Sequence, residues 1–101
     1  MTSFSRAIVA AIMASLLTAC ATMSVEQIVA ASDGATEATA YEVSSVRQEY
    51  EILRYLGLQP GRQALVMKDG KAYDVITASD PATGETRKIW FDISSFYGSG
   101  F

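Results

Sequence analysis

The stretch ALVMKDGKAYDV, residues 64–75, decides the fold of this chain. Its centre is Asp69-Gly70, a dipeptide that favours a two-residue type I′ turn, in which both central residues have positive φ. Residues that favour strands lie on both sides of it. We expect an antiparallel hairpin with strands at 62–68 and 71–79, and this turn pairs Lys68 with Lys71, Val66 with Tyr73 and Leu65 with Asp74.

A second turn extends the hairpin to three strands. The segment from Asp80 to Gly84 contains Pro81, which favours a turn, and ends in a glycine that tolerates a left-handed conformation. The third strand is then 86–93. If Asp80 closes against Glu85, this strand pairs with its neighbour through Val75–Trp90, Tyr73–Asp92 and Ile76–Ile89.

This register gives the predicted sheet two different faces. One is apolar enough to receive a helix and carries Leu65, Met67, Ala72, Ile76, Ile89, Phe91 and Ile93. The other has an apolar centre among charged groups, which is the composition of a binding hot spot, although such cross-strand pairs also stabilise a sheet without binding anything. The candidate binding surface on this second face consists of Val66, Tyr73, Val75, Trp90 and Lys88.

One main helix is expected before the sheet. Thr39 can cap its first turn together with Glu42, and Gly57 followed by Pro60 ends it near Leu56. Its core stripe recurs at three- and four-residue spacing: Val43, Val46, Tyr50, Leu53 and Leu56. Whether a short second helix forms before it is left open. Ser24 and Gln27 can form a capping box, but short helices rarely persist without packing.

The predicted fold class is therefore α+β, with one main helix packed on a three-stranded antiparallel meander. We expect this small domain to span 39–97 and to be followed by a flexible tail at 98–101. A domain of about sixty residues is only marginally stable. No disulfide within the chain can supplement its core, because the chain has one cysteine. Either the short helix or a partner should cover additional apolar surface.

Composition argues against several classes of function. The chain has 101 residues, 8 basic and 11 acidic side chains and no histidine, with a net charge of −3 and no basic cluster. Nucleic acid is therefore an unexpected partner, and no cofactor, metal or catalytic site is predicted. Asp74 alone is unusual, because the register places it on the core face, where we expect a salt bridge to Arg47, Arg54 or Arg87 rather than catalysis.

The first twenty residues indicate where the protein is located. A short segment with the single cation Arg6 precedes the apolar run 7–17, as in an export signal. The run ends in Leu17-Thr18-Ala19-Cys20, which resembles the lipobox of bacterial lipoprotein precursors. That resemblance implies a signal peptide at 1–19, cleavage before Cys20 and lipid on its thiol. A secretory signal cut elsewhere is the alternative.

The lipobox resemblance also implies a membrane location. Ala21 follows the cysteine in place of aspartate, which among Gram-negative lipoproteins implies transfer to the outer membrane. We expect residues 20–38, rich in alanine, serine and threonine, to form a lipid-anchored tether that includes the possible short helix.

Two functions are consistent with these expectations. The order of helices and strands resembles that of the small SmpA/OmlA-type lipoproteins of outer-membrane assembly, a likeness of architecture that covers about 24–93. It favours a non-catalytic, lipid-anchored envelope protein whose domain binds another protein, as an adaptor, an assembly accessory or an inhibitor. The alternative is a structural lipoprotein that self-associates through its exposed sheet face.

Overall fold

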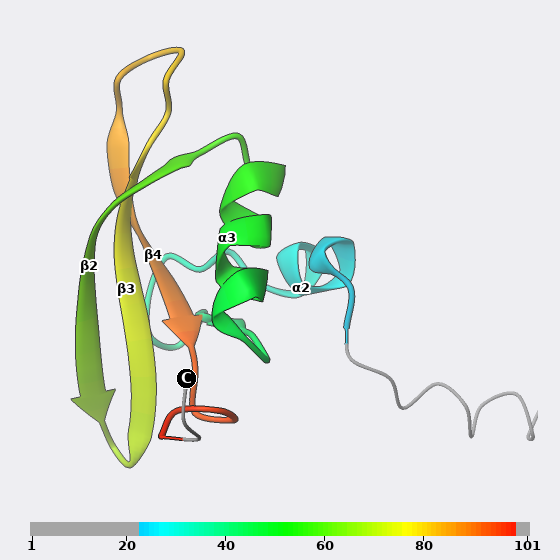
Figure 1. The fold of residues 1–101 in the computed structure, drawn as a ribbon, viewed down its shortest axis with the longest axis vertical. Helices are drawn as coiled ribbons and strands as arrows, with labels where there is room; N and C mark the ends of the chain where they lie inside the picture. Colours follow the sequence, from blue (N-terminus) through cyan, green and yellow to red (C-terminus); the bar gives the residue numbers. More distant parts are fainter. Residues whose placement is uncertain (1–22, 99–101) are drawn as a thin grey trace, which may run out of the picture.

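The computed structural model describes residues 23–98, which form two helices and a four-stranded mixed sheet (Figure 1). The α+β class is confirmed. The sheet has the strand order β1-β4-β3-β2. In chain order the elements are α2 (Val25–Ala31), β1 (Tyr41–Glu42), α3 (Val46–Tyr55), β2 (Gln59–Lys68), β3 (Lys71–Ser79) and β4 (Thr86–Asp92). Cys20, the predicted signal peptide and residues 99–101 of the predicted tail lie outside the described residues.

The two hairpins form as the sequence predicts. Asp69 and Gly70 have φ angles of 51° and 77°, the positive values that a type I′ turn requires. All the predicted pairs are present, from Lys68–Lys71 at the turn to Val75–Trp90 between β3 and β4. The second turn closes with a 2.8 Å hydrogen bond from the Asp80 amide to the Glu85 carbonyl.

The prediction of only three strands, all antiparallel, is wrong because β1 adds a short parallel strand beside β4. Tyr41 pairs with Phe91 and Glu42 with Asp92. Tyr41 and Val43 are both buried, and this two-residue spacing is that of a strand, in which alternate side chains share one face. The Tyr41 ring lies against Phe91, with the ring centroids 5.9 Å apart.

The main helix begins at Val46 and not at Thr39. Ser45 is its N-cap, and the Ser45 hydroxyl accepts a 3.1 Å hydrogen bond from the Gln48 amide. Thr39 instead belongs to the preceding loop, where its carbonyl accepts a hydrogen bond from the Gly34 amide. Ser45 and Gln48 have the same three-residue spacing as Thr39 and Glu42. Because Tyr41 is buried in the sheet, the helix begins after the later pair.

The predicted end of the main helix is correct. Gly57 has a φ of 74°, its amide donates to the Arg54 carbonyl, and the Leu58 amide donates to the Leu53 carbonyl. This pair of hydrogen bonds is a Schellman motif, which satisfies carbonyls that the helix leaves free. Ile52 and Leu53 of α3 are fully buried against the sheet, in a core that also contains Ala72, Ile76, Ala78, Ile89, Phe91 and Ile93.

The short helix that the sequence left open is present as α2. Ser24 and Gln27 form both hydrogen bonds of a capping box, and Ile28 is buried in the core. Residues 23–38 therefore belong to the folded domain, and the prediction that they act as a tether is wrong for this part of the chain. No helix among residues 23–98 has the length and apolar character needed to cross a membrane.

The predicted core face is correct for β3 and β4 but not for β2. Leu65 and Met67 were expected to lie under the helix, yet they are 52% and 57% exposed. Figure 1 shows β2 at the outer edge of the sheet, away from α3. A helix is about 10 Å wide and neighbouring strands lie about 4.8 Å apart, so α3 covers about two strands and leaves the side chains of Leu65 and Met67 on this edge strand exposed.

Candidate functional site

The candidate binding surface is not an exposed surface in this structure. Tyr73 and Val75 are each only 6% exposed, Val66 and Trp90 are half-buried, and Lys88 is exposed. The expectation that these residues form an open face is therefore wrong for the two residues at its centre.

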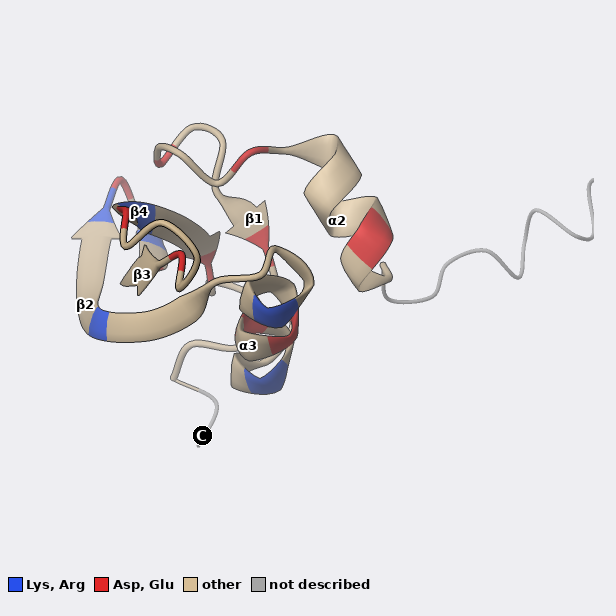
Figure 2. Cartoon of the chain, turned by 90° about the horizontal axis from the view of Figure 1, so that it is seen from above, with Lys and Arg blue, Asp and Glu red and all other residues tan. Residues whose placement is uncertain are grey.

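The α2–β1 loop, residues 32–40, explains this burial. The Trp90 amide donates a 2.8 Å hydrogen bond to the Gly34 carbonyl, which holds the loop against β4. Glu37 in the same loop forms an ion pair with Lys68 on β2, two strands away in the sheet order. The loop must therefore cross β3, and Figure 2 shows it and α3 on different sides of β3 and β4.

The α2–β1 loop has its own internal structure. The Gly34 amide donates to the Thr39 carbonyl at 2.8 Å, and the Ala35 amide donates to the Asp33 carboxylate at 3.0 Å. Hydrogen bonding from the Thr39 side chain, and then from the Ala35 amide, lowers the pKa of Asp33. Beneath the loop, the rings of Tyr73 and Trp90 meet edge to face with centroids 5.7 Å apart. The loop thus forms an ordered cover over that ring pair.

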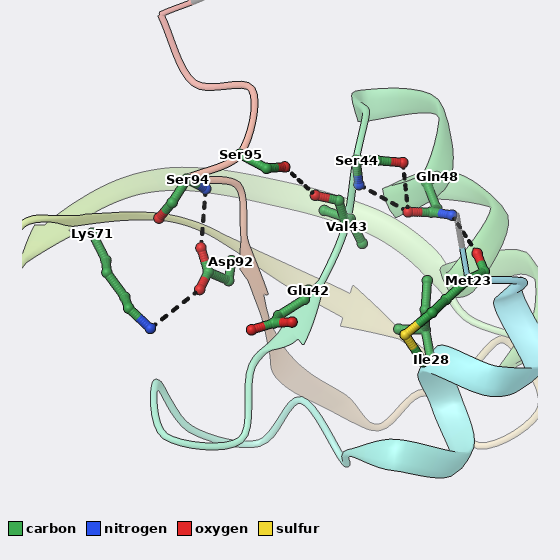
Figure 3. A pocket seen from close by; sticks show the side chains of 10 residues that line it. All are labelled: Met23, Ile28, Glu42, Val43, Ser44, Gln48, Lys71, Asp92, Ser94 and Ser95. Carbon is green, nitrogen blue, oxygen red and sulfur yellow. Dashed lines mark hydrogen bonds and ion pairs between the residues drawn. The ribbon is translucent and has the colours of Figure 1, made fainter. Parts of the chain in front are cut away.

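A cavity of about 500 Å³ lies beside the start of the described chain (Figure 3). We call it the Met23 cavity. It lies between α2, the N-terminal end of α3, β1 and the turn after β4. Its lining residues are Met23, Ile28, Glu42, Val43, Ser44, Gln48, Lys71, Asp92, Ser94 and Ser95. None of the five candidate residues lines it, and sequence analysis missed it because four separate segments build it.

Polar groups around the Met23 cavity are bonded to one another. The Gln48 side chain accepts from the Ser44 amide at 2.9 Å and donates to the Met23 carbonyl at 3.2 Å. The Asp92 carboxylate faces Lys71 at 3.7 Å and also accepts from the Ser94 amide. These bonds fix the shape of the wall, while Met23, Ile28 and Val43 supply apolar surface. Such a cavity is suited to binding an apolar group.

A buried pair of carboxyl groups lies at the interface of α3 and the sheet. Glu49 of α3 is 0% exposed, and neither of its carboxyl oxygens accepts a hydrogen bond from a donor in the described residues. Burial is the main cause that raises the pKa of Glu49 to about 9, and hydrogen bonding to Asp74 and repulsion by its charge act in the same direction. Glu49 is therefore protonated at neutral pH and shares its site with Asp74.

Asp74 is held by an amide and not by an arginine. The Gln63 side chain on β2 donates to the Asp74 carboxylate at 2.5 Å, and the Tyr50 hydroxyl bonds to Gln63 at 3.2 Å. The predicted salt bridge to Arg47, Arg54 or Arg87 is absent among the described residues. The sequence did place Asp74 on the core face, and the structure confirms its burial.

A known protein family matches most of this chain. A family model described as a domain of unknown function, DUF4919, matches residues 10–99. The chain belongs to the DUF4919 family. No curated protein and no solved structure matches it.

The DUF4919 match includes every described helix and strand, and with them both Glu49 and Asp74. Within the described part of this DUF4919 chain, no group of three or more histidine, cysteine, aspartate or glutamate side chains could hold a metal ion.

Proposed function

We propose that this chain is a non-catalytic, lipid-anchored envelope protein whose domain binds another protein. What carries the proposal is the lipobox resemblance of Leu17-Thr18-Ala19-Cys20, together with its closeness in sequence to Ser24, the N-cap of the first described helix. Four residues of extended chain span at most about 14 Å. A domain attached through Cys20 would thus lie close to the bilayer and not on a long tether.

The position of the Met23 cavity supports a binding role near the membrane. Met23 lines the cavity and is three residues from Cys20, so the cavity would open on the side of the domain nearest the anchor. Its apolar lining and internally bonded polar groups suit an apolar side chain presented by a protein in or on the same membrane. For a host with an outer membrane, Ala21 after the cysteine favours that location.

Lipidation is tested on the full chain expressed in a Gram-negative host. Wild-type protein should lose residues 1–19 and carry lipid on Cys20, whereas Cys20→Ser should remain an unprocessed precursor that no longer enters the detergent phase as a mature lipoprotein. Thr22→Ser is the matched control and should be processed normally. Mass spectrometry decides the result, because a mature N-terminus other than Cys20, or an unmodified thiol there, contradicts the proposal.

Binding at the Met23 cavity is tested in membranes with a photo-crosslinking residue at Glu42, an exposed position on the cavity wall. A defined adduct with one membrane protein is expected. Ser95→Trp, which fills the cavity, should remove this adduct, whereas Thr83→Trp in the distant β3–β4 turn should not. An adduct that Ser95→Trp leaves unchanged would place the partner elsewhere.

The alternative function, self-association through the sheet face that the sequence predicted to be exposed, has less support. Association through Val66, Tyr73, Val75 and Trp90 would require the α2–β1 loop to leave its place, because Tyr73 and Val75 are buried beneath it.

A further inference from the structure

We propose that the partner enters the Met23 cavity as a short extended peptide segment, which pairs with the backbone of Glu42 on β1 and places a basic side chain beside the Glu42 carboxylate. Since this segment is the part of the partner that the cavity would hold, it rests on the proposed function. Its binding is measured with isolated peptides, so it can fail while lipidation and membrane crosslinking succeed.

The backbone of Glu42 points away from the sheet. The Val43 amide donates a 3.2 Å hydrogen bond to the Asp92 carbonyl of β4. Successive residues of a strand direct their N–H and C=O groups to opposite sides, so those of Glu42 point away from β4. β1 is the end strand of the sheet, and no hydrogen bond within residues 23–98 uses either group. One donor and one acceptor are therefore available to a partner strand.

Glu42 lies where two cavities meet. A second cavity, of about 230 Å³, lies between α2, β1 and the α2–β1 loop, and it shares Met23, Ile28 and Glu42 with the Met23 cavity. Its other lining residues are small: Ala31, Ser32, Ala38 and Ala40. An extended peptide brings both apolar side chains and backbone groups to such a site, whereas a lipid acyl chain would leave the backbone of Glu42 unpaired.

The charges around Glu42 favour a basic side chain. Glu42 and Asp92 are register partners on β1 and β4, so their side chains lie on the same face of the sheet. Asp92 is paired with Lys71 at 3.7 Å, whereas Glu42 forms no ion pair with any residue that the structure describes. Figure 3 shows Glu42 between Asp92 on one side and Met23 and Ile28 on the other. A cation beside Glu42 would balance its charge on the side away from Lys71.

Strand geometry then sets the pattern of the segment. The residue that pairs with Glu42 directs its side chain to the same face as the Glu42 carboxylate, and this residue is the basic one. Its two neighbours point to the opposite face, where Val43, Met23 and Ile28 supply apolar surface. The expected segment is therefore extended and reads apolar, basic, apolar.

The test uses the peptide acetyl-TVKVT-amide and the full chain purified in detergent. The backbone amide signals of Glu42 and Ile28 should shift in NMR spectra as the peptide is added, with about millimolar dissociation because the contact is small. The peptide acetyl-TSKST-amide lacks the apolar neighbours and should bind about tenfold more weakly. A TVKVT peptide methylated on the lysine backbone nitrogen keeps every side chain but cannot donate, and it should also bind about tenfold more weakly.

Reversal of the charge at position 42 tests the basic side chain. Wild type should prefer TVKVT over TVEVT by about threefold, since an exposed ion pair contributes little. Glu42→Arg keeps the backbone groups and should reverse this preference. Glu26→Arg is the matched control, because Glu26 is exposed on α2 and lines neither cavity, and it should keep the wild-type preference. Thermal melts check that both variants are folded.

Amide exchange tests whether residues 20–22 of the chain itself are the occupant. In the free protein the Glu42 amide should exchange rapidly, and its exchange should slow when TVKVT is bound. A Glu42 amide that is already protected in the free protein overturns the proposal. So does the absence of TVKVT binding, equal binding of the methylated peptide, or a Glu42→Arg variant that retains the wild-type preference.

Discussion

At the β4 edge of the sheet the Trp90 amide donates to the Gly34 carbonyl and the Asp92 carbonyl accepts from the Val43 amide, whereas at the β2 edge no described residue meets the outward groups. The chain supplies its own cover on one side only. That cover consists of β1 and the α2–β1 loop, both from the segment before α3. A few residues of irregular chain are therefore enough to close one edge of a sheet of this size, while the β2 edge stays uncovered by the described residues.

The largest expected effect comes from breaking the closed edge at Gly34. Its φ is 64°, and a Cβ added there would lie 2.4 Å from the Tyr41 ring. Gly34→Val should therefore lower the free energy of unfolding by about 3 kcal/mol or more, through both backbone strain and overlap. Thermal melts measure the loss, and Trp90 fluorescence should shift to the red as the α2–β1 loop leaves.

Gly84→Val is the matched control for that variant. Gly84 has a φ of 77°, but no atom lies within 4 Å of the added Cβ, so only the backbone penalty of about 1–2 kcal/mol is expected. Equal losses for the two variants would show that the loop does not pack on Tyr41 in solution.

The next effect concerns the buried carboxyl groups of Glu49 and Asp74. The folded state keeps Glu49 protonated up to a pKa of about 9, whereas the ordinary value is 4.5, so the folded protein binds more protons between these values. Stability should be greatest below about pH 4.5, as far as this group is concerned, and should fall as pH rises toward 9. Glu49→Gln should remove this slope, so that the variant is more stable than wild type at pH 8 by a margin that widens as pH rises from 5 to 9.

Chemical denaturation across pH 5–9 measures this slope. Glu51→Gln on the same helix is the control and should keep the wild-type pH dependence. Because Gln63 on β2 bonds to Asp74, ionisation of Glu49 should also speed amide exchange in β2 more than in β1. A Glu49→Gln variant that retains the wild-type slope would show that another group is responsible.

The smallest effect is expected at the ion pair between Glu37 and Lys68. Both side chains are partly exposed, and exposed pairs contribute little to stability. Glu37→Gln should leave the melting temperature nearly unchanged but produce a small red shift of Trp90 fluorescence, because the loop is then held on one side only. Glu85→Gln in the β3–β4 turn should leave the spectrum as it is, and an identical shift in both variants would exclude a specific role for this ion pair.

The sequence predicted those parts of the fold that local chemistry specifies. Asp69-Gly70 fixed the register of β2, β3 and β4, and Gly57 with Leu58 fixed the end of α3. These features depend on φ angles that few residues adopt, so short motifs identify them.

Contacts between distant segments could not be predicted in the same way. Thr39 to Glu42 satisfies the pattern of a helix start, but burial of the Tyr41 ring on Phe91 makes this segment a strand. The α2–β1 loop has the composition of a linker, yet Gly34 and Glu37 each bond to a residue more than thirty positions later in the sequence. The burial of Tyr73 follows from those contacts, which no local pattern contains.

The capping box at α2 also has a mechanical consequence. A domain attached through Cys20 would receive any pulling force at Ser24, where two hydrogen bonds and the packing of Ile28 hold a seven-residue helix. Unwinding α2 lengthens the chain by about 2 Å per residue, or roughly 14 Å in all, while the sheet stays intact. The helix would then act as a reserve of length that yields before the rest of the domain and allows it to follow a partner away from the membrane.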